Sequence, residues 1–116
     1  MESRKTSFTC PDCGGSLEKL RSGDMLQYRC RVGHAFSADS ARTAHTGREE
    51  NTLWTAIVLL QEGAELALEI AATKKGEAAE QLRKEAHAKR ELAERVRAVV
   101  LELPSATVSA HAGENS

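Results

Sequence analysis

Aromatic residues are scarce in this chain of 116 residues, which contains one Trp, one Tyr and two Phe. Phe8, Tyr28 and Phe36 lie near the N-terminus, and Trp54 stands alone after them. The second half is instead rich in Ala, Glu, Leu, Lys and Arg, a composition typical of long helices. The two parts are therefore built differently, and the first has too few large apolar residues to fold without an additional cross-link.

Long apolar runs and a surplus of charge are also absent. The longest strongly apolar stretch, TAIVLL at residues 55–60, is far too short to span a bilayer. The N-terminal MESRKTSFTC lacks the apolar run of a signal peptide. The formal net charge of −1 gives no overall attraction to nucleic acid or to an acidic membrane. The odd number of cysteines, three, suits a reducing compartment better than a disulfide framework, so we expect a cytoplasmic protein without membrane insertion.

The cysteines and one histidine have the spacing of a metal site. The candidate ligands are Cys10, Cys13, Cys30 and His34. The C-x-x-C pair places two sulfurs on one tight turn, and C-x-x-x-H adds a third sulfur and a nitrogen. Tetrahedral Cys₃His coordination is a common structural zinc arrangement. Because four protein ligands leave no open position, the sequence predicts one structural Zn²⁺ rather than a catalytic one.

Other interpretations of these residues fit the surrounding sequence less well. A redox pair of Cys10 and Cys13 would stand between a strand and a helix of a larger βαβ fold, whereas two glycines and a candidate hairpin follow here. Iron is an alternative metal, although a rubredoxin-like site requires four sulfurs. His45 is the nearest competitor for the position of His34.

The stretch between the two ligand pairs, residues 16–29, predicts two short strands joined at SGD. Its apolar positions are Leu17, Leu20, Met25, Leu26 and Tyr28. Gly23 and Asp24 supply the turn. A β-hairpin that brings two metal-binding turns together is a zinc ribbon. We assign the ribbon to residues 8–37, after a flexible segment at residues 1–7.

A 3.6-residue apolar period predicts a helix over about residues 48–75. Its stripe is Leu53, Ile57, Leu60, Ala64, Ala67 and Ala71, a narrow seam of the coiled-coil kind. Ser37 is a candidate N-cap and Gly47 a candidate break before this helix, while Gly76 suits the turn after it. A second helix is predicted over about residues 77–103, where Pro104 stops it. Its stripe is Leu82, Ala86, Lys89, Ala93, Val96, Val100 and Leu103.

These elements predict a small α+β fold, in which the N-terminal zinc ribbon precedes an antiparallel two-helix hairpin. The hairpin occupies residues 38–103, and residues 104–116 form a disordered tail. Its core is rich in alanine and therefore meagre. We expect the hairpin to form a homodimer or to dock on a protein partner.

Several stretches resemble a known family. FTCPDCGGSL, YRCRVGHAFS and LWTAIVLLQEGAELA, followed by an alanine- and glutamate-rich helix, look like the C-terminal extension of some bacterial chemotaxis protein-glutamate methylesterases of the CheB type. The resemblance covers about residues 8–103. In that family the extension follows a receiver domain and a catalytic domain that uses a serine, a histidine and an aspartate. This chain has no G-x-S-x-G elbow, so the resemblance implies the four metal ligands and not the esterase activity.

The expected function is a non-catalytic, zinc-binding protein-interaction module in bacterial chemosensory or two-component signalling. The alternative is a zinc ribbon that binds nucleic acid or serves transcription. Residues 1–34 carry six Lys or Arg against four Asp or Glu, with Phe8, Tyr28 and Phe36 available for stacking on bases. That surplus is small for phosphate binding. An enzyme is not expected, because the metal site is closed and no serine has a candidate base beside it.

Overall fold

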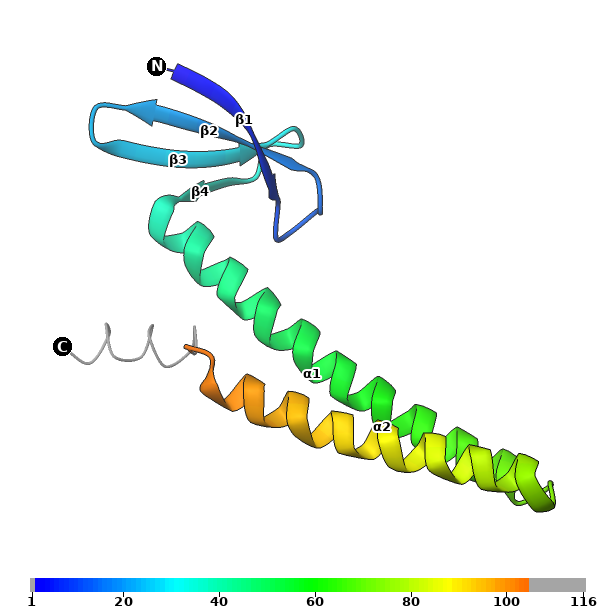
Figure 1. Ribbon diagram of the computed structural model, residues 1–116. Helices are drawn as coiled ribbons and strands as arrows, with labels where there is room; N and C mark the ends of the chain where they lie inside the picture. The colour runs from blue at the N-terminus through cyan, green and yellow to red at the C-terminus, as the bar shows by residue number, and fades with distance from the viewer. Residues whose placement is uncertain (1, 105–116) are drawn as a thin grey trace. The chain divides into compact units, whose positions relative to one another are not determined.

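The computed structural model describes residues 2–104 as four strands followed by two helices (Figure 1). These residues form two compact units that divide after Arg48. The small α+β class predicted from the sequence is confirmed. The predicted disordered tail lies, from residue 105 onward, outside the described residues.

The first unit contains one antiparallel sheet. Its strands follow one another in chain order: β1 (Glu2–Thr9), β2 (Ser16–Ser22), β3 (Met25–Cys30) and β4 (Ala35–Ser37). Strands β2 and β3 pair up to Ser22 opposite Met25, which leaves Gly23 and Asp24 as a two-residue turn. Gly23 has a φ of 61°, the positive value that the first position of such a hairpin turn requires. The hairpin predicted between the ligand pairs is confirmed.

The N-terminal segment differs from the prediction, because residues 2–7 belong to strand β1 and not to a flexible segment. Strand β1 pairs with β2, and its register shifts between Lys5 and Thr9. Within this irregular part, Thr6 Oγ1 donates a hydrogen bond of 2.8 Å to the Leu17 carbonyl oxygen. As an edge strand with mostly exposed side chains, β1 has no apolar alternation, so the period-2 signal that marks half-buried strands is missing.

The core of the first unit is very small. One cluster contains the buried Cys10, Leu17 and Cys30, with the half-buried Tyr28 and Phe36 packed against them, and Leu20 is buried outside this cluster. Two of these four buried residues are cysteines, whose thiols supply little apolar area. A unit with so little buried apolar surface needs an additional cross-link, such as a disulfide or a bound metal ion, to be stable.

Helix α1 (Ala38–Ala71) begins well before the predicted start at residue 48. Ser37 Oγ accepts a hydrogen bond of 3.1 Å from the Ser40 N–H, which confirms Ser37 as the N-cap. The prediction of a break at Gly47 is wrong, because α1 runs through this residue without interruption. A single glycine costs a helix interior only about 1 kcal/mol relative to alanine, too little to end a helix that is capped upstream.

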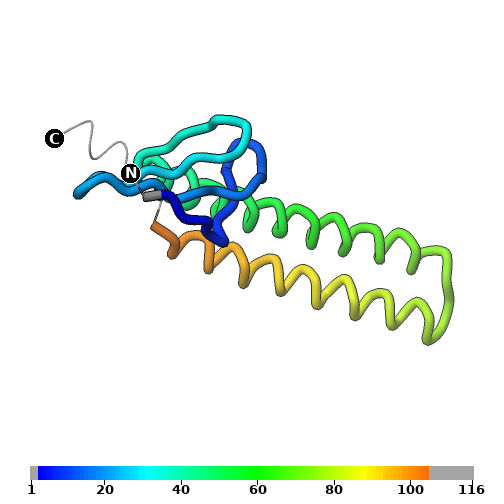
Figure 2. The backbone as a smooth tube through the Cα atoms, turned by 90° about the horizontal axis from the view of Figure 1, so that it is seen from above, coloured from blue at the N-terminus to red at the C-terminus, as the bar shows by residue number. Residues whose placement is uncertain are grey.

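The second unit is a helical hairpin, in which helix α2 (Gly76–Glu102) runs antiparallel beside the later part of α1 (Figure 2). The predicted seam is confirmed at its centre. The buried residues are Ile57, Ala64, Ala67 and Ala71 on α1, and Ala79, Ala86, Ala93 and Val100 on α2. The larger Leu53, Trp54, Leu60 and Val96 are half-buried around one end of the seam.

The link between the helices starts earlier than predicted, because α1 ends at Ala71 and not near residue 75. The N–H groups of Thr73 and Lys74 bond to carbonyl oxygens three residues back, at 2.9 and 3.1 Å, and this tighter winding closes the helix. Gly76 then takes a positive φ of 64°, in agreement with its predicted place in the turn. Within residues 2–104, neither helix combines the length and the apolar character that crossing a membrane requires.

Candidate metal centre

Cys10 and Cys13 lie on the turn that connects β1 to β2. The Gly14 N–H bonds to the Cys10 carbonyl oxygen at 2.8 Å, and the Cys10 N–H bonds to the Gly15 carbonyl oxygen at 2.6 Å. Gly14 has a φ of 76°, a conformation that residues with a side chain rarely adopt. These bonds fold the chain back on itself and bring both sulfurs to the same side of the turn. Cys10 is fully buried, whereas Cys13 is exposed.

Cys30 and His34 lie on the turn that connects β3 to β4. The Cys30 N–H bonds to the His34 carbonyl oxygen at 3.0 Å, and the Gly33 N–H bonds to the Cys30 carbonyl oxygen at 3.2 Å. Gly33 has a φ of 114°, so this turn also depends on a glycine. The His34 N–H points at the Cys30 sulfur at 3.3 Å. The two turns thus share a plan: a backbone loop closed by hydrogen bonds around a buried cysteine.

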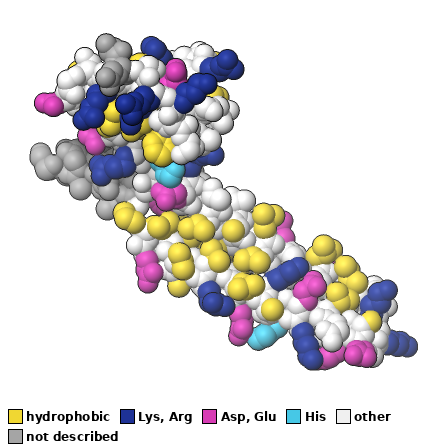
Figure 3. Space-filling view, turned by 45° about the horizontal axis from the view of Figure 1, so that its top comes forward, with side chains coloured by type: hydrophobic (Ala, Val, Ile, Leu, Met, Phe, Trp, Pro, Cys, Tyr) yellow, Lys and Arg dark blue, Asp and Glu magenta, His cyan; other side chains and the backbone are white. Residues whose placement is uncertain are grey.

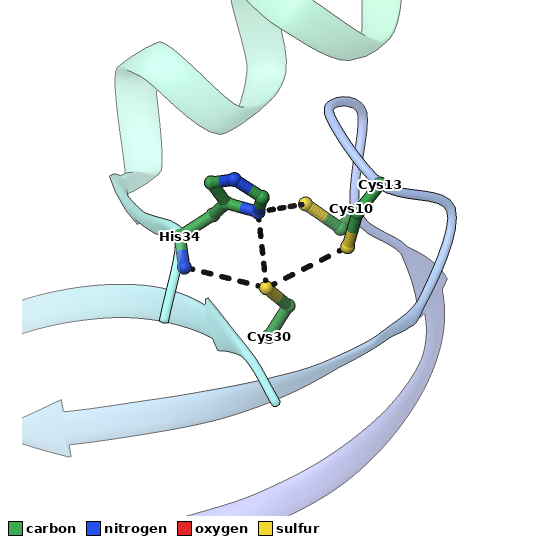
Figure 4. A group of neighbouring side chains, drawn as sticks. All are labelled: Cys10, Cys13, Cys30 and His34. Atoms are coloured by element: carbon green, nitrogen blue, oxygen red, sulfur yellow. Dashed lines mark hydrogen bonds between the residues drawn. The ribbon is translucent and has the colours of Figure 1, made fainter. Parts of the chain in front are cut away.

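The four predicted ligands converge on one space (Figure 4). Their ligand atoms all lie within 4.8 Å of one another. His34 Nδ1 is 3.3 Å from Cys30 Sγ and 3.7 Å from Cys10 Sγ, and the sulfurs of Cys13 and Cys30 are 3.7 Å apart. Figure 4 shows Nδ1 of the imidazole, rather than Nε2, as the atom nearest the sulfurs.

These distances are the edges of a tetrahedron of suitable size. A zinc ion with Zn–S bonds of about 2.3 Å and a Zn–N bond of about 2.0–2.1 Å separates two sulfurs by about 3.8 Å, and a sulfur from the nitrogen by about 3.6 Å. The observed separations of 3.3–3.7 Å are close to both values. All three cysteines are free thiols, and their sulfurs are much farther apart than in a disulfide. The four side chains could therefore hold one metal ion without rearrangement of the backbone.

The environment of Cys30 favours the thiolate that a metal ligand must supply. Burial raises the pKa of this thiol, but hydrogen bonds from the backbone N–H groups of His34, Gly33 and Val32, together with the Cys13 thiol, bring it down to about 6. Amide N–H groups directed at a sulfur stabilise its negative charge. The sequence did not predict a role for these amides of the second turn. The Gly-His pair after the third cysteine is the signal that marks them.

Cys13 has a different environment. The Gly15 N–H lowers the pKa of the Cys13 thiol, but partial desolvation and the neighbouring sulfurs of Cys10 and Cys30 outweigh it and leave the pKa raised. Like charges brought close together disfavour ionisation of the second group. A cation placed among the three sulfurs would relieve this repulsion, and such relief is what a metal ion supplies.

The surroundings of the cluster bear on the alternatives considered from the sequence. Cys13 precedes strand β2, whereas a thioredoxin-type pair would precede a helix. His45, the competing histidine, lies outside the cluster on helix α1. Three sulfurs and one nitrogen in a closed shell suit zinc better than metals that require oxygen ligands or open positions. A comparison of the chain with protein-family models, with curated proteins and with solved structures finds no match.

Proposed function

We propose that the four-residue cluster is a structural zinc site and that the sheet around it is a zinc ribbon. The observation that carries this proposal is the convergence of one nitrogen and three sulfurs within 4.8 Å of one another. Four protein ligands complete a tetrahedral shell, so the ion would have no position for water or substrate. Its role would be to supply the folding energy that the small core of the first unit lacks.

The second part of the proposal is that the chain acts as a protein-interaction module through its helical hairpin. Large aliphatic side chains remain exposed on both helices. They are Val58, Leu59, Leu66 and Ile70 on α1, and Leu92, Val99 and Leu101 on α2. So many exposed large aliphatic side chains on a hairpin of this size favour association with another protein. The chemosensory setting is supported by the resemblance of both parts, in the same order, to the methylesterase extension.

Affinity capture from a bacterial lysate tests the interaction and its setting. The tagged full chain is incubated with native lysate, with nuclease added to half of the sample, and the retained proteins are identified by mass spectrometry. We expect a discrete protein to be retained in both halves, and a chemoreceptor or a methylesterase among them would support chemosensing. If the retained proteins were lost from the nuclease-treated half, the proposal that the chain is a protein-interaction module would be contradicted.

One observation favours nucleic-acid binding as a second candidate. The strand register places Arg4 opposite Lys19, Lys19 opposite Tyr28, and Tyr28 opposite Phe36, so two cations and two aromatic rings form one row across the sheet. Like charges directly opposite one another destabilise a sheet, so the stability of the sheet does not explain the Arg4–Lys19 pair. A phosphate backbone would suit the two cations of this row, and bases could stack on the exposed part of the half-buried Tyr28 and Phe36 rings.

Fluorescence anisotropy with a labelled single-stranded oligonucleotide tests this candidate. Lys19→Glu should weaken binding and flatten its salt dependence if the row contacts phosphates. Lys84→Glu makes the same charge change at an exposed position on α2 and serves as the control. Absence of binding at low salt, or equal effects of the two variants, would remove nucleic acid from consideration.

A further inference from the structure

One face of the helical hairpin carries an exposed aliphatic row. The row consists of Leu59, Gly63, Leu66 and Ile70, spaced by four, three and four residues along α1, so its members lie above one another on one side of the helix. Leu59 and Leu66 are 62% and 58% exposed, and Ile70 is 40% exposed. Figure 3 shows hydrophobic side chains gathered along the pair of helices.

Helix α2 contributes to the same face. A Cβ atom built on Gly63 would lie 3.2 Å from Cδ and Nζ of Lys89, so the Lys89 side chain lies across Gly63. Lys89 also donates to Glu85 Oε2 at 3.2 Å. Leu92 follows Lys89 by three residues and therefore extends the face on α2. This face, made of the aliphatic row together with Glu85, Lys89 and Leu92, is called the row face below.

The opposite face of the hairpin has a different character. The Arg97 guanidinium lies 5.7 Å from the centroid of the Trp54 ring, and Arg83 forms an ion pair of 3.3 Å with Glu80. Leu101, four residues after Arg97, is the exposed aliphatic side chain on that side of α2. Val58, four residues after Trp54 on α1, is likewise exposed on this side, so two large aliphatic side chains here compare with four on the row face, Leu59, Leu66, Ile70 and Leu92.

The charges and the apolar side chains of the row face share one centre. The midpoint of the row falls between Gly63 and Leu66. Because Gly63 lies beside Lys89 and the helices are antiparallel, that level on α1 corresponds to the midpoint of Glu85 and Lys89 on α2. A two-fold axis that lies in the plane of the face at this level, perpendicular to the helices, therefore maps the aliphatic row onto itself and the Glu85–Lys89 pair onto itself.

We propose that a second copy of this chain covers the row face and that the two hairpins form a four-helix bundle around this axis. In this arrangement Leu59 packs against the partner's Ile70, and Leu66 packs into the space that the absent side chain leaves at the partner's Gly63. Lys89 meets the partner's Glu85, and Glu85 meets the partner's Lys89. The same surface patch is used twice, as a two-fold interface requires.

The whole side of the hairpin that carries the row face is as large as the interface of a stable dimer. The 27 residues of α2 extend for about 40 Å at 1.5 Å per residue. Two helices packed about 8–10 Å apart present a face about 20 Å wide, which gives about 800 Å² for each copy. Standard stable interfaces bury about 800 Å² per partner. The proposed dimer rests on the proposed function in one respect, which is that the hairpin is the interaction surface; a second copy of the chain is then its partner.

Sedimentation equilibrium of the full, zinc-loaded chain between about 1 and 100 μM tests the proposal. The wild type should be a dimer within this range. Leu66→Glu should weaken association at least about tenfold, because it places a charge in the centre of an apolar interface. Leu101→Glu makes a matched change on the opposite face and should leave the dimer intact. Circular dichroism should show equal helix content in all three proteins.

A charge reversal tests the symmetry of the interface. Glu85→Lys should weaken the dimer, because two lysines on each copy then face each other, and the double variant Glu85→Lys with Lys89→Glu should restore it. A monomeric wild type, a dimer that survives Leu66→Glu, or a dimer lost equally with Leu101→Glu would overturn the proposal. Zinc content is measured on the same samples. A monomer that retains one zinc overturns the dimer alone, whereas a chain without zinc contradicts the proposed function.

Discussion

Replacing Cys13 by serine tests the metal assignment most directly, because Cys13 is the exposed ligand and its loss leaves the small core intact. Structural zinc contributes about 10–16 kcal/mol to the folding of small metal domains. Leu17 and Leu20 are the large aliphatic side chains buried in the first unit, and each contributes about 1.5–3 kcal/mol. A zinc ion held by the four side chains would therefore outweigh the apolar core, and we expect the sheet to unfold when zinc binding is lost.

The chain contains its own reporters for this experiment. Its one tyrosine, Tyr28, lies in the sheet, and its one tryptophan, Trp54, lies in the helical hairpin. In the Cys13→Ser variant, or after addition of a strong chelator, the near-ultraviolet dichroism of Tyr28 should collapse. The emission of Trp54 and most of the far-ultraviolet helix signal should persist. The apparent zinc affinity should fall by more than the roughly 10–100-fold that outer-sphere changes cost, because a ligand itself is removed.

Val32→Ser is the matched control, since Val32 is 77% exposed and its side chain is not a ligand. This variant should retain one zinc per chain, measured by inductively coupled plasma mass spectrometry, together with the wild-type Tyr28 signal. If Cys13→Ser kept both its metal and its Tyr28 signal, the four-ligand assignment would be refuted. If the wild type folded fully with no metal bound, the reasoning about the small core would fail instead.

Four further predictions concern the first unit and α1. Leu17→Ala should lower the free energy of unfolding of the sheet by about 2–5 kcal/mol, because it opens a cavity in the core; chemical denaturation followed through Tyr28 measures this. Gly14→Ala should destabilise the zinc-loaded protein by about 1–2 kcal/mol, because Gly14 has a φ of 76°. Gly47→Ala, in contrast, should stabilise the protein by about 1 kcal/mol, since Gly47 lies within α1 and an added Cβ would meet no atom within 4 Å. Thermal unfolding compares the two glycine variants, and a change of the same sign in both would contradict the assignment of their backbone conformations. Zinc affinity should rise with pH through neutrality, because the Cys13 thiol, whose pKa is raised, must lose its proton to ligate; competition with a chelator at several pH values should show no plateau below neutral pH.

The convergence of the three cysteines and His34 could be predicted from the sequence because its information is local. Cys10 and Cys13 share one turn, Cys30 and His34 share another, and the intervening hairpin is short enough to bring the turns together. Ligand spacing therefore predicts which side chains meet. Ligand spacing does not predict which imidazole nitrogen faces the sulfurs, nor how the amides of the second turn lower the pKa of Cys30. Both depend on the path of the backbone between the ligands.

The edges of the fold could not be predicted in the same way. Strand β1 is held by backbone pairing with β2 and by Thr6, and its exposed side chains carry no periodic signal. Strand β4 has only three residues, Ala35–Ser37, too few for any period to appear. The early start of α1 depends on one hydrogen bond at Ser37, and the stretch from Ala38 to Gly47 has no apolar stripe that would indicate a helix. Hydrogen bonds to the backbone, two of them made by the hydroxyls of Thr6 and Ser37, decide these three features rather than a periodic apolar pattern.

The composition of the hairpin core has a consequence for the whole chain. Six of the eight buried seam residues are alanines, which allow the helices to approach closely but bury little area each. The larger Leu59, Leu66 and Ile70 could have filled that seam, yet they lie three or four residues apart on the row face instead. A helix pair that serves only its own stability would place its largest aliphatic side chains inward. In the two proposals made above, each unit is completed by something beyond its own core: the sheet by the ion that its four side chains can hold, and the hairpin by the second copy that covers its row face.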